Sequence, residues 1–260
     1  MPTESPLTQV NLLGVNVAAI DLAATCAVIG GWLARRDRRY VCVRDVHGLM
    51  LCRGDDAYRR LHNRAGLVVP DGMPLVWAAR LRGHRQVGRV GGADLMLALC
   101  RATAADGRRH FFLGGASGVA EKLAARLGER VPGLQIVGAV GPPIWPWSPA
   151  EDRHLVQMIN DSGADVAWIG LGSPKQEQWM AANRDRLNPS VLIGVGAAFD
   201  FLAGTKRRAP PWMRRAGLEW LHRLISEPAR LWRRYLLVTP RFVPLAVLQA
   251  LGLGHYPVDG

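Results

Sequence analysis

The sequence predicts an α/β fold with a Rossmann-like, doubly wound and mainly parallel sheet that carries a basic helical appendage at its C-terminal end. Continuous apolar runs such as VAWIG (166–170) and VLIGVG (191–196) have the composition of strands covered on both faces. These runs alternate with longer amphipathic segments, as in doubly wound sheets. The 260 residues, 49% of them hydrophobic, suit one large domain with a sizeable core and argue against disorder.

The predicted strands are short apolar runs, and helix-like amphipathic segments lie between them. The strands are expected at Val10–Val17, Tyr40–Val43, Leu67–Val69, His110–Leu113, Gln135–Val140, Val166–Gly170 and Val191–Val195. The helices are expected at Leu22–Arg35, Asp56–Asn63, Leu95–Ala105, Val119–Arg130, Ala150–Ser162 and Glu177–Arg186. Ligands of such sheets bind beyond the carboxyl ends of the strands, so we expect the chemistry in the loops that follow strands.

The N-terminal segment and the cysteines favour a cytoplasmic protein. Residues 1–9 are polar and have no basic segment followed by an apolar run, so no secretory signal is predicted. The four cysteines are scattered without a C-x-x-C pair, which favours free thiols in a reducing compartment. No clustered metal ligands are visible, so no metal site is predicted.

The formal net charge of +12 favours an anionic partner, with nucleic acid, anionic lipid and a nucleotide diphosphate as candidates. Much of the charge lies beyond Gly204, where arginine, tryptophan and proline become frequent. We therefore divide the chain into an α/β core, residues 1–204, and a basic appendage, residues 205–260. Helices are expected in the appendage at about Arg214–Ile225 and Glu227–Leu237.

The second appendage helix has the composition of an element that lies on a membrane surface. Arg230, Arg233 and Arg234 occupy neighbouring positions on it, and tryptophans flank them. Attraction to anionic lipid is worth about 1 kcal/mol per basic residue. The alternative is a basic face that is simply solvated. Prolines interrupt the apolar residues 236–253, so no membrane-spanning helix is predicted.

Asp71 and Gly72 follow the predicted strand Leu67–Val69, and Pro74 suits the first position of the next helix. This places the Asp71 carboxylate at the ligand edge of the sheet, where it can act as a catalytic base. An aspartate before glycine is also a common turn residue, so the position alone leaves both interpretations open.

A glycine-rich loop, GGASG at residues 114–118, follows the predicted strand His110–Leu113. Glycine lets the backbone approach a phosphate, and the helix that follows offers unpaired N–H groups. Gly114, Gly115 and Ser117 are therefore candidate contacts for a nucleotide. The full G-x-G-x-x-G pattern and its acidic ribose ligand are not found, which disfavours NAD.

The segment GLGSPKQEQW, residues 170–179, begins at the end of another predicted strand. Ser173 and Pro174 suit a helix start, as cap and first helical residue. That explanation does not account for the polar side chains crowded behind them, among which Lys175 is well placed to meet a phosphate. The candidate substrate contacts in this segment are Gly172, Lys175, Gln176 and Glu177.

The segment GVGAAFDFLAG, residues 194–204, follows the last predicted strand with small residues that permit close backbone approach. Phe199 and Phe201 are each expected either in the core or stacked on a base, and the core is expected for at least one of them. Phe199 and Asp200 are taken as candidate substrate contacts.

Five motifs in order resemble those of the WecG/TagA/CpsF glycosyltransferases. The resemblance covers about Val10 to Arg241, and the motifs are VPDGMPLVW, FFLGGASGVAEKLAARL, IGLGSPKQEQW, GVGAAFDFLAGTKRRAPPWM and GLEWLHRLISEPARLWRRY. It implies an inverting transferase, independent of metal and cofactor, that uses a UDP-sugar donor. The implied donor sugars are N-acetylmannosamine, its uronic acid or a hexose.

The implied acceptor is a sugar linked to undecaprenyl diphosphate, and the implied products are cell-surface polysaccharides or teichoic-acid-type polymers. Such an enzyme would work in the cytoplasm, bound peripherally to the anionic inner face of the plasma membrane. Related proteins can self-associate through the α/β domain, so a homo-oligomer is a candidate state.

The resemblance also implies roles for single residues. Asp71 matches the aspartate of the family's P-D-G motif, which is the proposed general base, and Gln176 matches a glutamine implicated in activity. Three arginines match residues of the family's appendage that are thought to close over the active site and stabilise the departing diphosphate. These arginines are Arg223, Arg230 and Arg233.

One motif departs from the family pattern. Many members carry T-x-N after the second strand, where this sequence has Val43 and Asp45. Val43 cannot donate a hydrogen bond and Asp45 adds a negative charge, so Asp45 is expected to contact a substrate in a different way. Arg44 and His47 are candidates for the changed recognition.

Two other classes of protein fit parts of the sequence. The charge suggests a nucleic-acid-binding protein, but the tryptophans lie in a leucine-rich amphipathic context rather than among base-stacking basic residues, so no nucleic-acid partner is predicted. The glycine loop suggests a nucleotide-dependent oxidoreductase, which the incomplete pattern disfavours.

Overall fold

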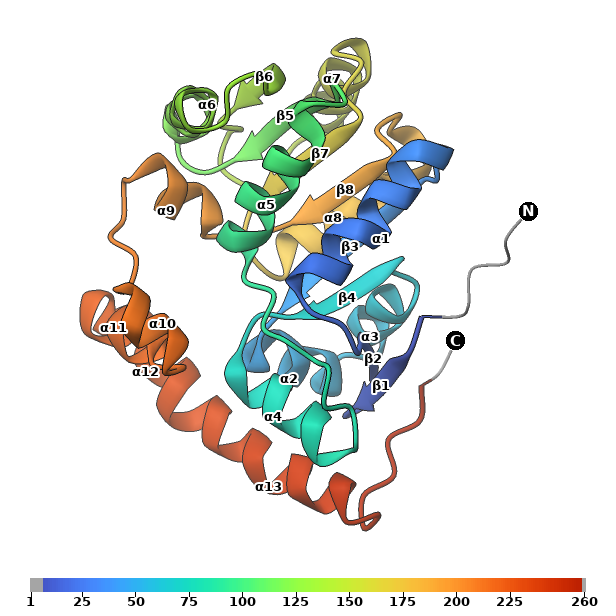
Figure 1. The fold of residues 1–260 in the computed structure, drawn as a ribbon, viewed down its shortest axis with the longest axis vertical. Coiled ribbons are helices and arrows are strands. Elements are labelled where there is room, and N and C mark those ends of the chain that lie inside the picture. The colour runs from blue at the N-terminus through green and yellow to red at the C-terminus, as the bar shows by residue number, and fades with distance from the viewer. Residues whose placement is uncertain (1–6, 259–260) are drawn as a thin grey trace.

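The chain folds around one six-stranded parallel sheet. A computed structural model describes residues 7–258, except for the side chain of Arg215; residues 1–6, most of the polar N-terminal segment discussed above, lie outside this range. The strand order is β4-β3-β8-β7-β5-β6, and every neighbouring pair is parallel (Figure 1). The strands are β3 (Arg39–Arg44), β4 (Leu67–Pro70), β5 (Arg109–Gly114), β6 (Gln135–Val140), β7 (Val166–Gly170) and β8 (Val191–Gly194). The predicted α/β fold is confirmed.

The first predicted strand, Val10–Val17, is wrong as a single element. It forms an antiparallel hairpin of β1 (Gln9–Leu12) and β2 (Val15–Ala18). Leu13 and Gly14 both have positive φ, 51° and 90°, as the two-residue turn between twisted strands requires. The run looked continuous because the turn residue Leu13 is itself apolar and buried.

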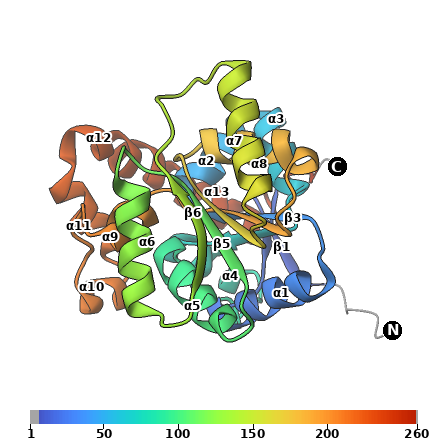
Figure 2. The same ribbon diagram turned by 90° about the horizontal axis from the view of Figure 1, so that it is seen from above.

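Helices cover both faces of the sheet and enclose two hydrophobic clusters (Figure 2). One face carries α1 (Leu22–Arg35), α5 (Gly92–Ala104), α6 (Val119–Arg130) and α9 (Ala198–Ala203). The other carries α2 (Val46–Gly54), α3 (Asp56–Asn63), α4 (Met73–Leu81), α7 (Pro149–Asp161) and α8 (Lys175–Asn183) with the short η1 (Arg184–Arg186). Strand side chains alternate between the clusters, as Val41 and Cys42 do, so every strand except the half-exposed edge strand β6 is buried on both faces. All four cysteines are free, as predicted.

Beyond Gly204 the chain forms a series of helices along one side of the core. They are α10 (Pro211–Arg215), α11 (Glu219–Ser226), α12 (Pro228–Trp232), the π-helical η2 (Arg233–Val238) and α13 (Thr239–Ala250). The second predicted appendage helix is therefore longer than expected, because α12, η2 and α13 follow one another without a break to Ala250. Among residues 7–258, no helix has the length and apolar character needed to cross a bilayer.

The end of the appendage is fixed to the core. Helix α13 packs against α4 and α2 (Figure 1), and Phe242 is buried in the core cluster. The Gln249 side chain accepts a hydrogen bond from the Leu13 N–H at 3.1 Å, and the Asn11 amide donates to the Tyr256 carbonyl at 2.7 Å. Point substitutions are therefore better tests of the appendage than truncation, which would uncover Phe242.

Candidate active site

Asp71 lies at the carboxyl end of the edge strand β4. Its N–H donates to the Arg44 carbonyl at the end of the neighbouring β3, at 2.7 Å, which fixes the turn into α4. Its half-buried carboxylate has Oδ1 3.5 Å from Nη1 of Arg89. The predicted position of Asp71 and Gly72 at the ligand edge of the sheet is what the structure has.

An ionic cluster joins the appendage to the core beside Asp71. Arg89 binds Glu219 of α11 at 2.8 Å and Asp94 of α5 at 2.9 Å. Asp94 also binds two appendage arginines, Arg208 at 2.6 Å and Arg214 at 3.4 Å. The appendage is thereby held over the ligand edge. Sequence reasoning missed this cluster, because nothing in the chain indicates which of its many charges meet.

The pKa of the Asp71 carboxyl is raised above its ordinary value. Burial is the largest cause; the Arg89 guanidinium opposes it, and the negative charge of Glu219 adds to it. Two charges have smaller effects on the same carboxyl: Arg223 lowers its pKa and Asp94 raises it. A carboxylate with a raised pKa is a stronger base while it is ionised, which suits a catalytic base.

Glu219→Gln should lower the pKa of Asp71, because it removes a negative charge and frees Arg89 to pair with Asp71. The acid limb of the kcat/KM profile against pH should then move to lower pH, which a pH series with the wild type alongside would measure. Glu129→Gln, an exposed change on α6, is the control and should leave the limb in place. An unchanged limb in Glu219→Gln, or a shift to higher pH, would contradict the assignment.

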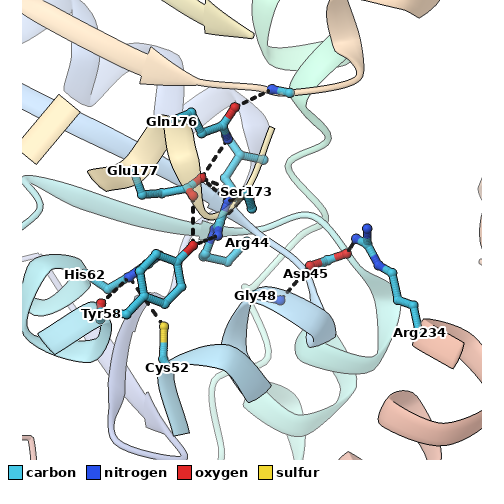
Figure 3. Close-up of polar contacts among 12 residues, drawn as sticks. Arg44, Asp45, Gly48, Cys52, Tyr58, His62, Ser173, Gln176, Glu177 and Arg234 are labelled. Carbon is cyan, nitrogen blue, oxygen red and sulfur yellow. Dashed lines mark hydrogen bonds and ion pairs between the residues drawn. The ribbon is translucent and has the colours of Figure 1, made fainter. Parts of the chain in front are cut away.

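A buried polar network lies below the segment after β7 (Figure 3). Arg44 and Glu177 are 2% and 0% exposed and form an ion pair. The Tyr58 hydroxyl donates to Glu177 at 2.8 Å and accepts from Arg44 at 2.9 Å. Burial alone would raise the pKa of Glu177, but Arg44 and the hydrogen bonds from Tyr58 and Gln176 outweigh it and hold the pKa below its usual value. Arg44 and Glu177 therefore remain charged and organise this edge from inside.

Of the three polar residues at 175–177, Gln176 and Glu177 are bound within the protein. Gln176 is buried, donates to Glu177 at 2.6 Å and accepts from the Gly196 N–H at 3.0 Å, so both ends of its amide are engaged within the protein. Lys175 is half-buried at the start of α8. Ser173 does not cap that helix as expected, since its hydroxyl accepts from Arg44 and donates to Glu177.

Asp45, the departure from the T-x-N pattern, connects α2 with the appendage. Its carboxylate caps α2 by accepting from the Gly48 N–H at 3.0 Å, and it forms an ion pair with Arg234 of η2 (Figure 3). The extra negative charge is therefore balanced by Arg234, an arginine that the sequence placed on a membrane-facing helix rather than beside Asp45. Val43, at the other position of the pattern, is buried in the core.

The three appendage arginines expected to act are placed differently from one another. Arg223 is half-buried and its positive charge lowers the pKa of Asp71, so it acts on the carboxylate. Arg230 is exposed and pairs with Glu227 of the appendage at 2.7 Å. Arg233 is exposed as well. In this arrangement only Arg223 of the three acts on the charge at the ligand edge.

The glycine-rich loop at residues 114–118, predicted to bind a phosphate, packs closely against the end of β7. Gly114 and Gly115 have φ of 148° and 75°, and a Cβ on Gly114 would lie 2.5 Å from Cα of Gly170, so no side chain fits there. Ser117 is exposed, and α6 begins after Gly118 without a side-chain cap. The first N–H of this helix, that of Val119, donates to the Ala116 carbonyl at 3.0 Å.

Phe199, taken as a candidate substrate contact, lies in the core, which was the other place expected for it. It is 1% exposed, its ring lies against Gly170, and it meets Phe112 edge to face at 6.2 Å between ring centres. A ring enclosed in the core has no face on which a base can stack. Asp200 is half-buried and engaged with Thr205 and Lys206 at the start of the appendage. In the described part of the chain, no group of three or more His, Cys, Asp or Glu residues is arranged to hold a metal ion.

The fold and this edge define the class of an α/β enzyme: a carboxylate with a raised pKa and glycine-rich loops lie beyond the carboxyl ends of parallel strands, beside a cationic appendage. The chain belongs to the glycosyl transferase WecG/TagA/CpsF family, which matches residues 10–255. The resemblance of its motifs is thus confirmed, and the protein is a glycosyltransferase.

Three bacterial relatives share the name N-acetylglucosaminyldiphosphoundecaprenol N-acetyl-beta-D-mannosaminyltransferase. The protein of Bacillus spizizenii is 31% identical over 72% of this chain and 70% of its own length. That of Bacillus subtilis is 31% identical over 75% and 73%. That of Staphylococcus aureus is 29% identical over 68% of each chain.

Proposed function

We propose that this glycosyltransferase moves a sugar from a UDP-sugar to an acceptor sugar linked to undecaprenyl diphosphate, in the synthesis of a cell-surface polysaccharide or teichoic-acid-type polymer. The sugar is N-acetylmannosamine, its uronic acid or a hexose. The observation that carries the proposal is the place of Asp71 at the carboxyl end of β4, beside Arg89, which binds Glu219 of the appendage. Burial there raises the pKa of the Asp71 carboxyl. The names of the three relatives contain N-acetylglucosaminyldiphosphoundecaprenol, and this supports the proposed acceptor.

The reaction is a single displacement with inversion. The Asp71 carboxylate takes the proton of the acceptor hydroxyl as its oxygen bonds to the anomeric carbon of the donor. The bond between that carbon and the diphosphate oxygen breaks on the opposite face, and UDP leaves with the electron pair. A positioned base of this kind contributes about 10²–10⁴-fold to the rate.

The departing diphosphate needs positive charge in a preorganised setting. The uncapped start of α6, together with Lys175 and Arg223, provides it. Gly172, with φ of 76°, forms the turn that leads from β7 towards Lys175. We propose that these groups replace a metal ion, so turnover should continue in the presence of a chelator.

The direct test offers a panel of UDP-sugars with undecaprenyl-diphospho-N-acetylglucosamine and detects the product by mass. One elongated lipid product, formed in the presence of EDTA, is the expected result. Thermal shifts with UDP, NAD and a DNA duplex test the two rival classes. Stabilisation by NAD, or salt-sensitive retention of DNA, with no sugar transfer would overturn the proposal.

We further propose that the appendage holds the enzyme on the anionic inner face of the plasma membrane. Large apolar side chains are exposed along it among its arginines. They are Trp212, Trp220, Ile225, Trp232, Leu236, Leu237, Val243, Val247, Leu248, Leu251 and Leu253. Apolar side chains inserted beside basic ones are the combination that binds anionic bilayers.

Replacing Trp232 and Leu236 together by alanine should weaken binding to anionic vesicles at least tenfold. Full burial of such a side chain is worth about 1.5–3 kcal/mol, and about 1.4 kcal/mol corresponds to tenfold. Vesicle co-sedimentation measures the effect. Ile144→Ala is the control, because Ile144 is 93% exposed but follows β6, at the edge of the sheet opposite β4. Equal losses in the two variants would contradict a specific role of the appendage.

A further inference from the structure

Helix α4 carries an open hollow that the proposed reaction does not yet use. The hollow has a volume of about 640 Å³ and is lined by Trp77, Arg80, Leu81 and Arg85. Trp77 and Leu81 are 52% and 68% exposed, which is unusual for such large apolar side chains on a helix of the core.

We propose that this hollow binds the diphosphate and the first isoprenoid units of the lipid-linked acceptor. The inference rests on the proposed function and adds to it the place where the lipid part of the acceptor is held. Trp77 and Leu81 contact the isoprenoid chain, and Arg80 and Arg85 contact the diphosphate.

The hollow begins close to the catalytic carboxylate. Helix α4 starts at Met73, two residues after Asp71, and rises about 1.5 Å per residue, so Trp77 and Leu81 lie about 6 Å and 12 Å further along its axis. Their i,i+4 spacing puts both side chains on one face. An acceptor whose sugar hydroxyl meets Asp71 can therefore lay its diphosphate and then its lipid along this face.

The charges of the hollow suit a diphosphate. The Arg80 side chain is fixed by two bonds to the Val87 carbonyl, from Nε at 3.2 Å and Nη2 at 2.9 Å. Among the residues that the structure describes, neither Arg80 nor Arg85 forms an ion pair with a carboxylate. Two guanidinium groups without acidic partners, beside an exposed indole and a leucine, complement a molecule with an anionic head and an apolar tail.

The order of the strands separates this hollow from the donor loops. The glycine loops follow β5 and β7, whereas α4 follows β4 at the opposite edge of the sheet. A donor on the glycine loops leaves the α4 side free for the acceptor, with Asp71 between them.

The hollow also adjoins the appendage, whose apolar side chains we place at the membrane. A Cβ on Gly217 would lie 3.0 Å from Cγ of Met73 and 3.9 Å from the Trp77 ring, and Arg82 donates to the Gln249 carbonyl of α13 at 3.0 Å. Both ends of α4 are thus in contact with the appendage, so a lipid lying in the hollow can continue into the bilayer.

The binding test uses farnesyl diphosphate, which has both chemical features of the occupant, against inorganic diphosphate. We expect Trp77→Ala/Leu81→Ala to weaken farnesyl diphosphate binding at least tenfold in titration calorimetry and to leave diphosphate binding unchanged. Arg85→Ala should weaken both. Ile144→Ala is the matched control and should change neither. Both lining residues are exposed, so an unchanged melting temperature is expected and verifies folding.

The kinetic test compares two acceptors in detergent, one with the undecaprenyl chain and one with a short water-soluble chain. Trp77→Ala/Leu81→Ala should raise KM for the long acceptor about tenfold, with KM for the short acceptor and for the donor unchanged. A variant that binds farnesyl diphosphate like the wild type and keeps both KM values overturns the inference. If Trp77→Ala/Leu81→Ala loses vesicle binding but keeps its KM for the long acceptor, the hollow binds the membrane and the inference is overturned as well. If the wild type turns over neither acceptor, the proposed function fails. The calorimetry still tests the inference in that case, because it measures binding and needs no turnover.

Discussion

Asp71→Asn is expected to lower kcat by about 10²–10⁴-fold, because the amide cannot take the proton of the acceptor hydroxyl. The substitution keeps the size of the side chain and the backbone bond to the Arg44 carbonyl, so the fold and the donor site should persist. Turnover with the lipid-linked acceptor measures the loss, and titration of UDP in the same preparation should give an affinity close to that of the wild type. The lost rate would then belong to the chemical step.

Two comparisons make this result specific to Asp71. Asp161→Asn removes an exposed carboxylate at the end of α7 and should leave kcat unchanged. Residual turnover in Asp71→Asn should also lose the acid limb of its pH profile, since that limb belongs to the raised pKa of Asp71. Turnover within about threefold of the wild type, far below the contribution of a positioned base, would remove Asp71 from the mechanism.

The parallel core was predictable because its inner strands are buried on both faces and therefore appear as apolar runs, as Trp168 and Ile169 of β7 illustrate. The hairpin at β1 and β2 was not, since a buried leucine occupies its turn. Helix α2 was missed because its short, weakly amphipathic sequence gives little helical periodicity. Its start depends on the Asp45 cap, which is recognisable only when the helix is known.

The position of Asp71 was predictable because a topological rule connects strand ends with ligands. The partners of the site were not, since they lie far apart in the chain: Arg89 meets Glu219, and Asp45 meets Arg234. Phe199 illustrates the opposite error, because an aromatic residue after a glycine loop suits a base-stacking role and a core role equally well. Only the packing against Gly170 decides between them.

Arg44→Met is expected to lower the free energy of unfolding by about 3–5 kcal/mol, the usual cost of leaving one charge of a buried pair without its partner. Glu177 would keep its burial and lose its guanidinium. Urea unfolding of wild type and variant at neutral pH measures the difference. The pair of the exposed Arg186 with the half-buried Asp152, at 2.6 Å, provides the control, since removing the solvated guanidinium in Arg186→Met should cost only about 0–1 kcal/mol.

The pH dependence of stability tests the same pair independently. In the wild type the pKa of Glu177 is depressed, so its contribution is complete above the ordinary glutamate pKa of about 4.3 and is lost as pH falls through the lower folded-state value. In Arg44→Met burial is unopposed by the guanidinium, the pKa should rise, and stability should instead be lost as pH rises. The double variant Arg44→Met/Glu177→Gln removes both charges and should recover much of the loss.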